Sequence, residues 1–216
     1  MSTHPKPIPT RVGILCVALL LPACSVLNPL PAAPMQTYAL DRVVGTDTPV
    51  PLQQATSTVR TASAAQRVIL ISMPTAAPGY DSSRMVYTRE AGSLESFTHS
   101  VWVDTPARML APLMAHALQE SAAYRAVLLA PGAARADLRL DSSIVRLQQS
   151  YLQQPSQAHF SLRVTLLDNN SREVLAWHEF DIAEPASAEN ASGAAAATRA
   201  AVQKVMQELV LWLADY

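Results

Sequence analysis

Residues 159–166 read His-Phe-Ser-Leu-Arg-Val-Thr-Leu, an uninterrupted alternation of polar and apolar side chains. Successive side chains of a β-strand point to opposite faces of the sheet, so this segment predicts a strand with one buried face and one face in water. Residues 168–171, Asp-Asn-Asn-Ser, come next and are typical of a tight turn. The pattern predicts that this strand belongs to an antiparallel meander.

The segments on either side continue the alternation. Before residue 159, Leu138, Leu140 and Ile144 share one parity, whereas Val145 and Leu147 share the other. A slip of one residue within a strand is typical of a β-bulge, which we therefore expect near residue 144. After the turn, apolar side chains recur at Val174, Ala176, Phe180 and Ile182.

Two segments have the period of an amphipathic helix. Thr105 and Pro106 provide a hydroxyl cap and a proline at the first helical position. The face predicted to be buried in this helix comprises Met109, Leu110, Leu113, Met114, Ala117 and Leu118. In the second helix, over residues 194–214, it comprises Ala197, Ala201, Val202, Val205, Met206, Leu209, Val210 and Leu213. We expect Leu113 and Leu209 to lie in the core.

The remaining strands are predicted from shorter runs at residues 36–40, 68–73, 84–89, 94–103 and 126–129. Gly79, in the turn over residues 77–83, is expected to adopt a positive φ. Residues 36–216 then form one domain, an α/β (α+β) sandwich with a mixed β-sheet covered by helices. Residues 41–66 show no period and predict a flexible loop, either disordered or functional.

The N-terminus has the features of a lipoprotein signal. A basic segment containing Lys6 and Arg11 precedes ten residues, 12–21, that are too short to span a bilayer as a helix. Residues 21–24, Leu-Pro-Ala-Cys, then resemble a lipobox, although proline is unusual at its second place. We expect residues 1–23 to be a signal peptide, Cys24 to carry diacylglyceryl and N-acyl groups, and residues 24–35 to be a lipidated tether. The alternative is a secreted protein in which Cys24 is a stray thiol.

Composition and motifs exclude several other classes. Sixteen basic against 17 acidic residues, with a net charge of −1, leave no basic surplus for nucleic acid. The five histidines are scattered without metal-ligand spacing, and no phosphate-binding glycine loop is present. Ser82, Ser83, His99 and Asp104 could form a hydrolase set, but no GxSxG motif presents a nucleophile. We therefore expect neither catalysis, nor a metal site, nor a cofactor beyond the acyl groups.

Several segments in a fixed order resemble the ABC-type transport auxiliary lipoproteins of the PqiC kind. They are Tyr38-Ala39-Leu40, the apolar strand at residues 68–71, residues 77–87, Trp102 before Thr105-Pro106, and the Ala-rich final helix ending in Leu211-Trp212. The likeness spans residues 38–212, and it is most specific over residues 79–87. Residues 41–66 are longer than the family's usual spacing.

The resemblance implies a periplasmic lipoprotein that works with an MCE-domain protein and an MlaE-type ABC permease with its ATPase. It implies a role in lipid trafficking between the membranes and in envelope integrity. Ser25, where an Asp would signal inner-membrane retention, implies the outer membrane, with the periplasmic face of the inner membrane as the alternative. A homo-oligomer would suit docking on an MCE assembly. The alternative function is a structural or assembly-assisting outer-membrane lipoprotein unrelated to transport.

The turn before residue 84 is the candidate partner interface. It displays Tyr80 beside Asp81, and aromatic residues on loops often anchor interfaces. The alternative is that Tyr80 covers the core and Asp81 bonds only within its own turn.

Overall fold

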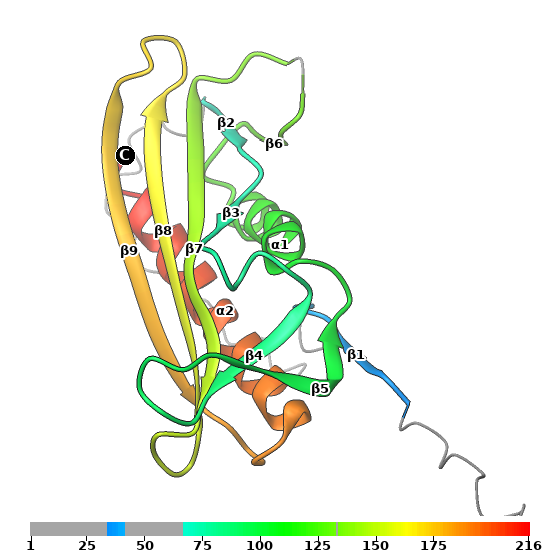
Figure 1. Cartoon of the computed structure of the whole chain (residues 1–216). Helices are drawn as coiled ribbons and strands as arrows, with labels where there is room; N and C mark the ends of the chain where they lie inside the picture. The colour runs from blue at the N-terminus through cyan, green and yellow to red at the C-terminus, as the bar shows by residue number, and fades with distance from the viewer. Residues whose placement is uncertain (1–33, 42–66, 133) are drawn as a thin grey trace, which may run out of the picture. The chain divides into compact units, whose positions relative to one another are not determined.

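The computed structural model describes residues 34–41, 67–132 and 134–216 (Figure 1). The predicted signal peptide, Cys24 and almost all of the predicted tether and 41–66 loop lie outside these residues. The described residues from Met35 onward belong to one compact unit.

The predicted meander is confirmed as three long antiparallel strands, β7 (Leu138–Ser150), β8 (Gln157–Asp168) and β9 (Val174–Pro185). The register of β7 on β8 shifts between Ile144 and Arg146, where the apolar parity predicted a bulge. Between β8 and β9, the carboxylate of Asp168 accepts hydrogen bonds from the backbone N–H groups of Asn170 and Ser171, both at 2.8 Å. These bonds close the predicted turn.

Strand β7 connects the two parts of the sheet. One of its edges pairs with β8, and the opposite edge pairs in turn with three short strands that run parallel to it. They are β2 (Val68–Ile71), β3 (Thr75–Ala76) and β4 (Arg84–Thr88). Strand β6 (Ala126–Leu129) extends the sheet from β2, and β5 (Glu95–Trp102) followed by β1 (Gln36–Tyr38) extends it from β4. Over the described residues the result is a mixed nine-stranded sheet with two helices, which confirms the predicted α+β class.

The two helices, α1 (Pro106–Glu120) and α2 (Ala191–Leu213), bury their apolar sides on the sheet. Helix α2 crosses β8 and β9, whereas α1 packs on β6, β2 and β3 (Figure 1). Alternate residues of β8, from Phe160 to Leu166, are fully buried beneath α2. The side chains between them, such as Arg163, point to the other face, which no helix covers over these strands.

The predicted face of α2 is correct, but the predicted face of α1 is displaced. Leu209 is fully buried, whereas Leu113 is only half-buried. In α1 the side buried on the sheet is formed by Leu110, Met114 and Leu118 together with Ala107, Ala111 and Ala115. Small alanines let the helix approach the sheet closely, and this rotates the flanking residues Met109, Leu113 and Ala117 toward the edge of the contact.

Two boundaries and the burial of one residue also differ from the prediction. Strand β2 ends at Ile71, and Met73 beyond it is exposed. Val174 is exposed because the register of β8 on β9 shifts at Leu166 and Leu167, which moves it out of the buried alternation. Helix α2 begins three residues earlier than predicted, because Asn190 caps it by accepting a hydrogen bond from the N–H of Gly193 at 2.9 Å.

Candidate functional site

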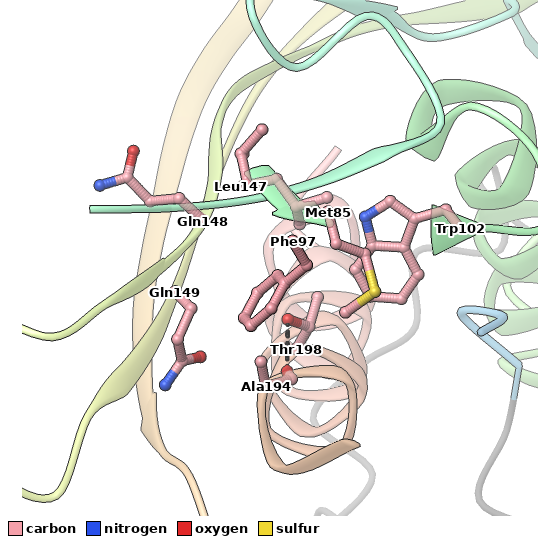
Figure 2. Close-up of a pocket in the computed structure, with 9 residues that line it drawn as sticks. Met85, Phe97, Trp102, Leu147, Gln148, Gln149, Ala194 and Thr198 are labelled. Atoms are coloured by element: carbon pink, nitrogen blue, oxygen red, sulfur yellow. Dashed lines mark hydrogen bonds between the residues drawn. The ribbon is translucent and has the colours of Figure 1, made fainter. Parts of the chain in front are cut away.

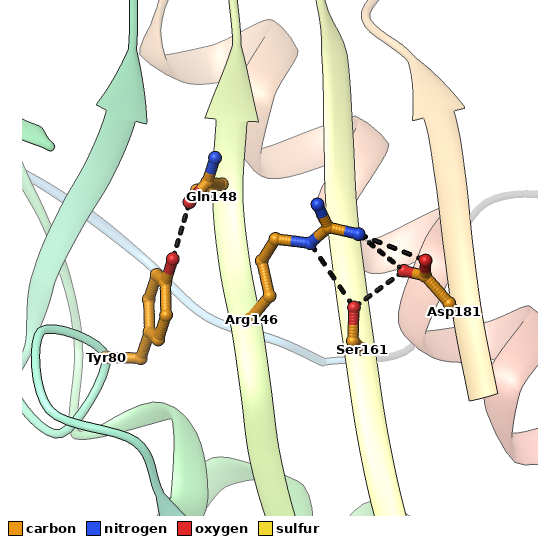
Figure 3. A network of polar contacts seen from close by, with 5 residues as sticks. All are labelled: Tyr80, Arg146, Gln148, Ser161 and Asp181. Atoms are coloured by element: carbon orange, nitrogen blue, oxygen red, sulfur yellow. Dashed lines mark hydrogen bonds and ion pairs between the residues drawn. The ribbon is translucent and has the colours of Figure 1, made fainter. Parts of the chain in front are cut away.

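The uncovered face of β7, β8 and β9 carries a polar network that joins all three strands (Figure 3). Arg146 on β7 donates to both carboxylate oxygens of Asp181 on β9, at 2.9 and 3.0 Å. Between them on β8, Ser161 accepts from Arg146 Nε at 3.3 Å and donates to Asp181 Oδ1 at 2.6 Å. Because these groups bond one another, the network links the three strands across this face of the sheet.

The same network sets the protonation of its neighbours. The hydrogen bond from Ser161, assisted by Arg146, lowers the pKa of Asp181 below its ordinary 3.8. His159 lies two residues before Ser161, and burial together with the nearby Arg146 lowers its pKa below 6.5, although Asp181 opposes this shift. The structure therefore favours a neutral His159 beside an ionised Asp181.

Tyr80, one of the two predicted interface residues, is anchored to the sheet. It is half-buried against the core, and its hydroxyl donates to Gln148 Oε1 on β7 at 2.5 Å (Figure 3). Burial raises the pKa of Tyr80, against the opposing effect of Arg146. Asp81 next to it is exposed. Gly79 has φ +94°, as predicted, so the chain turns sharply just before these two residues.

The side chains considered for hydrolysis are engaged in separate local contacts. Ser82 Oγ lies 3.5 Å from Arg84 Nε, and Asp104 accepts from the N–H of Thr105 at 2.7 Å and pairs with Arg108 at 3.1 Å. His99 is exposed on β5. Within residues 34–41, 67–132 and 134–216, no group of three or more His, Cys, Asp or Glu side chains could hold a metal ion.

A small cavity lies where β4, β5 and β7 meet the start of α2 (Figure 2). Its volume is about 10 Å³, and Met85, Phe97 and Trp102 form its apolar wall. Thr198 beside it donates to the carbonyl of Ala194 at 2.8 Å. Such a space holds no more than one water molecule, so it cannot accept an acyl chain.

A larger cleft, which the sequence analysis did not identify, lies nearby. It has a volume of about 290 Å³ and is lined by Tyr87, Arg89, Phe97, Thr98, His99, Ser100 and Tyr151. Its sequence signal is the pair of i, i+2 spacings, Tyr87 with Arg89 and Phe97 with His99, on two strands joined by a hairpin. Because residues two apart in a strand lie on one side of it, this spacing could have placed the four side chains together.

Comparison with protein families gives a match over residues 51–210 to the ABC-type transport auxiliary lipoprotein component. The chain belongs to this family. The resemblance inferred from the sequence is therefore confirmed. Membership implies a non-catalytic role and association with an ABC transport system. No curated protein matches the chain.

Solved structures resemble this auxiliary lipoprotein to different degrees. A protein from Xanthomonas campestris is 27% identical with a TM-score of 0.63, over 69% of this chain and 84% of its own. An uncharacterised protein has the same TM-score at 8% identity, over 84% of this chain and 99% of its own. PelC from Paraburkholderia phytofirmans, solved as a dodecamer, is more distant at 14% identity and a TM-score of 0.42, over 69% and 92%.

Neither described helix of the auxiliary lipoprotein has the length and apolar character needed to cross a membrane.

Proposed function

We propose that this auxiliary lipoprotein is anchored through acylated Cys24 at the periplasmic face of the outer membrane. There it serves an MCE-protein and MlaE-type ABC system that moves lipids between the membranes. The family match over residues 51–210 carries this proposal, and the lipobox at residues 21–24 supplies the anchor. A lipidated protein with a tether remains on its membrane, because two or three acyl chains bind a bilayer far more strongly than one.

The arrangement of polar groups supports a docking role over a chemical one. The side chains on the open face of β7, β8 and β9 neutralise one another in pairs, such as Arg146 with Asp181 and Arg163 with Glu179. Loops carried by a rigid sheet are well suited to partner recognition.

We place the partner contact at the loop that carries Tyr80 and Asp81. The hydrogen bond from Tyr80 to Gln148 holds this loop on β7, so that Asp81 is presented at the surface on a fixed support. Tyr80 then acts mainly by positioning the loop, and Asp81 is the residue that meets the partner.

The experiment is co-isolation of the tagged chain with envelope proteins, using the wild type and the Cys24→Ala and Asp81→Ala variants. Recovery of an MCE protein and an ABC permease with the wild type supports the proposal. Cys24→Ala should abolish acyl labelling and membrane retention. Asp81→Ala should reduce partner recovery while the melting temperature stays within a few degrees. Tyr80→Phe, which keeps the ring but removes the hydrogen bond to Gln148 that positions the loop, should reduce partner recovery as well.

Two results would contradict the proposed function. Recovery of only an outer-membrane assembly machine would replace the transport role by an assembly-assisting one. A mature N-terminus with an unmodified Cys24, or one that begins at another residue, would exclude the anchor.

A further inference from the structure

The cleft at the β4–β5 hairpin has the composition of a ligand site. Tyr87 and Phe97 contact each other with ring centroids 4.8 Å apart, and Tyr151 meets Tyr87 edge-on at 5.7 Å. The volume of about 290 Å³ is close to the lower end of the range for small-ligand pockets. Tyr87 is nearly buried and Arg89 lies over its ring, so Phe97 and Tyr151, which are only partly buried, are the rings that can meet a small organic cation.

Two opposite charges meet at one phenol oxygen in this cleft. Arg89 donates to the hydroxyl of Tyr87 at 3.2 Å and lies 4.9 Å from the centre of that ring. The same hydroxyl donates to Glu95 Oε2 at 2.9 Å. The Arg89 guanidinium therefore lines the cleft, and the Tyr87 hydroxyl holds the Glu95 carboxylate just outside the lining residues.

Arg89 is available to a ligand. Its side chain is exposed, and among the residues that the structure describes it has no carboxylate within ion-pair distance. A guanidinium presents several N–H donors that match the oxygens of a phosphate. A simple anion would nevertheless be repelled by Glu95, whereas a ligand with both charges would satisfy both groups.

The cleft also lies near the chain's route to the membrane. Strand β1 lies beside β5 (Figure 1). Gln36 of β1 pairs with Ser100 of β5, and Ser100 lines the cleft. Only residues 25–35 separate Cys24 from Gln36, and eleven extended residues span at most about 40 Å. A domain tethered by acylated Cys24 therefore keeps this cleft within about 40 Å of the lipid head groups.

We propose that this cleft binds the zwitterionic head group of a phospholipid of the phosphoethanolamine type. The phosphate bonds to Arg89, and the ammonium lies against the aromatic rings and Glu95. The assignment rests on the proposed function only through the acylated Cys24 that brings the cleft to the membrane.

The test is calorimetric titration of the purified full chain with glycerophosphoethanolamine, glycerophosphoglycerol and inorganic phosphate. Glycerophosphoethanolamine should bind at least about tenfold more tightly than the other two, a difference of about 1.4 kcal/mol. Equal binding of the two glycerophosphodiesters, or tighter binding of phosphate alone, would overturn the proposal, the latter in favour of a simple anion site.

Substitutions of Arg89 and of Glu95 test the contribution of each charge separately. Arg89→Ala should weaken glycerophosphoethanolamine binding about tenfold or more, and Glu95→Gln should remove the preference over glycerophosphoglycerol. Arg125→Ala, which removes an exposed arginine beside β6, is the matched control and should change neither. If Arg89→Ala unfolds the chain, Arg89→Lys preserves the charge and should retain weaker but selective binding. Full affinity in a folded Arg89→Ala variant would exclude Arg89.

Binding to head groups within a membrane is tested with the acylated chain anchored in nanodiscs. A nuclear magnetic resonance signal of the His99 imidazole should shift in phosphatidylethanolamine discs and remain unchanged in phosphatidylglycerol discs. The same His99 signal in both types of disc would overturn the assignment of the cleft to phosphoethanolamine head groups. These measurements need no transport partner, so head-group binding without co-isolated partners would contradict only the proposed function.

Discussion

Gly193 shows how one missing side chain decides the position of a helix. A Cβ at this residue would lie 2.0 Å from the carbonyl oxygen of Ala188 and 2.8 Å from two further backbone atoms of that residue. Backbone cannot move away as a flexible side chain can. The first turn of α2 therefore follows its loop more closely than any larger residue would allow.

We predict that Gly193→Ala destabilises the protein by at least about 2 kcal/mol, because the added methyl overlaps fixed backbone. Chemical denaturation followed by circular dichroism measures the loss. Ser192→Ala, at the exposed neighbouring position, is the control and should change stability by less than about 0.5 kcal/mol. Equal effects of the two substitutions would show that the loop before α2 can relax.

The polar network on the open face predicts a dependence of stability on pH. The pKa of His159 is lower in the folded chain than its ordinary 6.5, because burial disfavours the charged ring. The neutral His159 ring therefore makes its full contribution to the free energy of unfolding above pH 6.5. This contribution is lost as the pH falls toward the lower pKa of the folded chain. The pKa of Asp181 is also lowered, so its contribution is present above 3.8 and is lost as the pH falls through the depressed value.

His159→Gln should accordingly flatten the loss of stability between about pH 7 and pH 5. Urea unfolding at a series of pH values measures the slope. Asp181→Asn should alter the slope only at more acidic pH. If the wild type and His159→Gln lose stability equally between about pH 7 and pH 5, His159 is not the source of that loss.

At the scale of the element, α2 separates core positions from surface positions within one turn. Leu209 is 0% exposed, whereas Leu211 is 66% exposed. The helix is held at its N-terminus by the Asn190 cap and along its length by an ion pair from Lys204 to Glu184 of β9. Burial of its apolar side against β8 and β9 is the larger contribution, because an exposed ion pair stabilises little.

We predict that Leu209→Ala costs about 2–5 kcal/mol, through lost burial and an incompletely filled cavity. Leu211→Ala should cost less than about 0.5 kcal/mol. Thermal and denaturant unfolding of the two variants provides the comparison. Similar losses in the two variants would mean that the buried face of α2 is assigned wrongly. In α1, we expect Leu110, and not Leu113, to behave like Leu209.

At the scale of the whole molecule, β7 connects parts that would otherwise share no sheet. It pairs with β8 on one edge and with β2, β3 and β4 along the other. Arg67, just before β2, also donates to the backbone carbonyl of Tyr216, the last residue. Segments distant in sequence therefore become neighbours through one strand.

This topology predicts the order of amide hydrogen exchange. The amides at the centre of β7 should exchange most slowly, because opening them requires disruption of pairing on both edges. Those of the three-residue β1, which pairs only with β5, should exchange fastest among the strands. Mass spectrometry of exchanged peptides, or nuclear magnetic resonance, measures both. Comparable protection of β1 and β7 would contradict the central position of β7.

The local patterns were sufficient for the meander, the bulge after Ile144, the Gly79 turn and the buried side of α2. Each depends on interactions between residues close in sequence or on a simple period of apolar side chains. The family resemblance also followed from motifs in order. The prediction for α1 was less accurate, because alanine carries little apolar signal even where its small size allows the closest packing.

Only the tertiary structure decided which strands run parallel, that both helices lie on one face, and that Tyr151 joins the residues of the β4–β5 hairpin in a cleft. Parallel pairing joins segments separated by long connections, and no local period encodes which distant edges will meet. Tyr80 shows the same division at a single residue. Its turn could be read from the neighbouring glycine, but its anchoring to Gln148, 68 positions later, depends on β7 lying beside that turn in the folded chain.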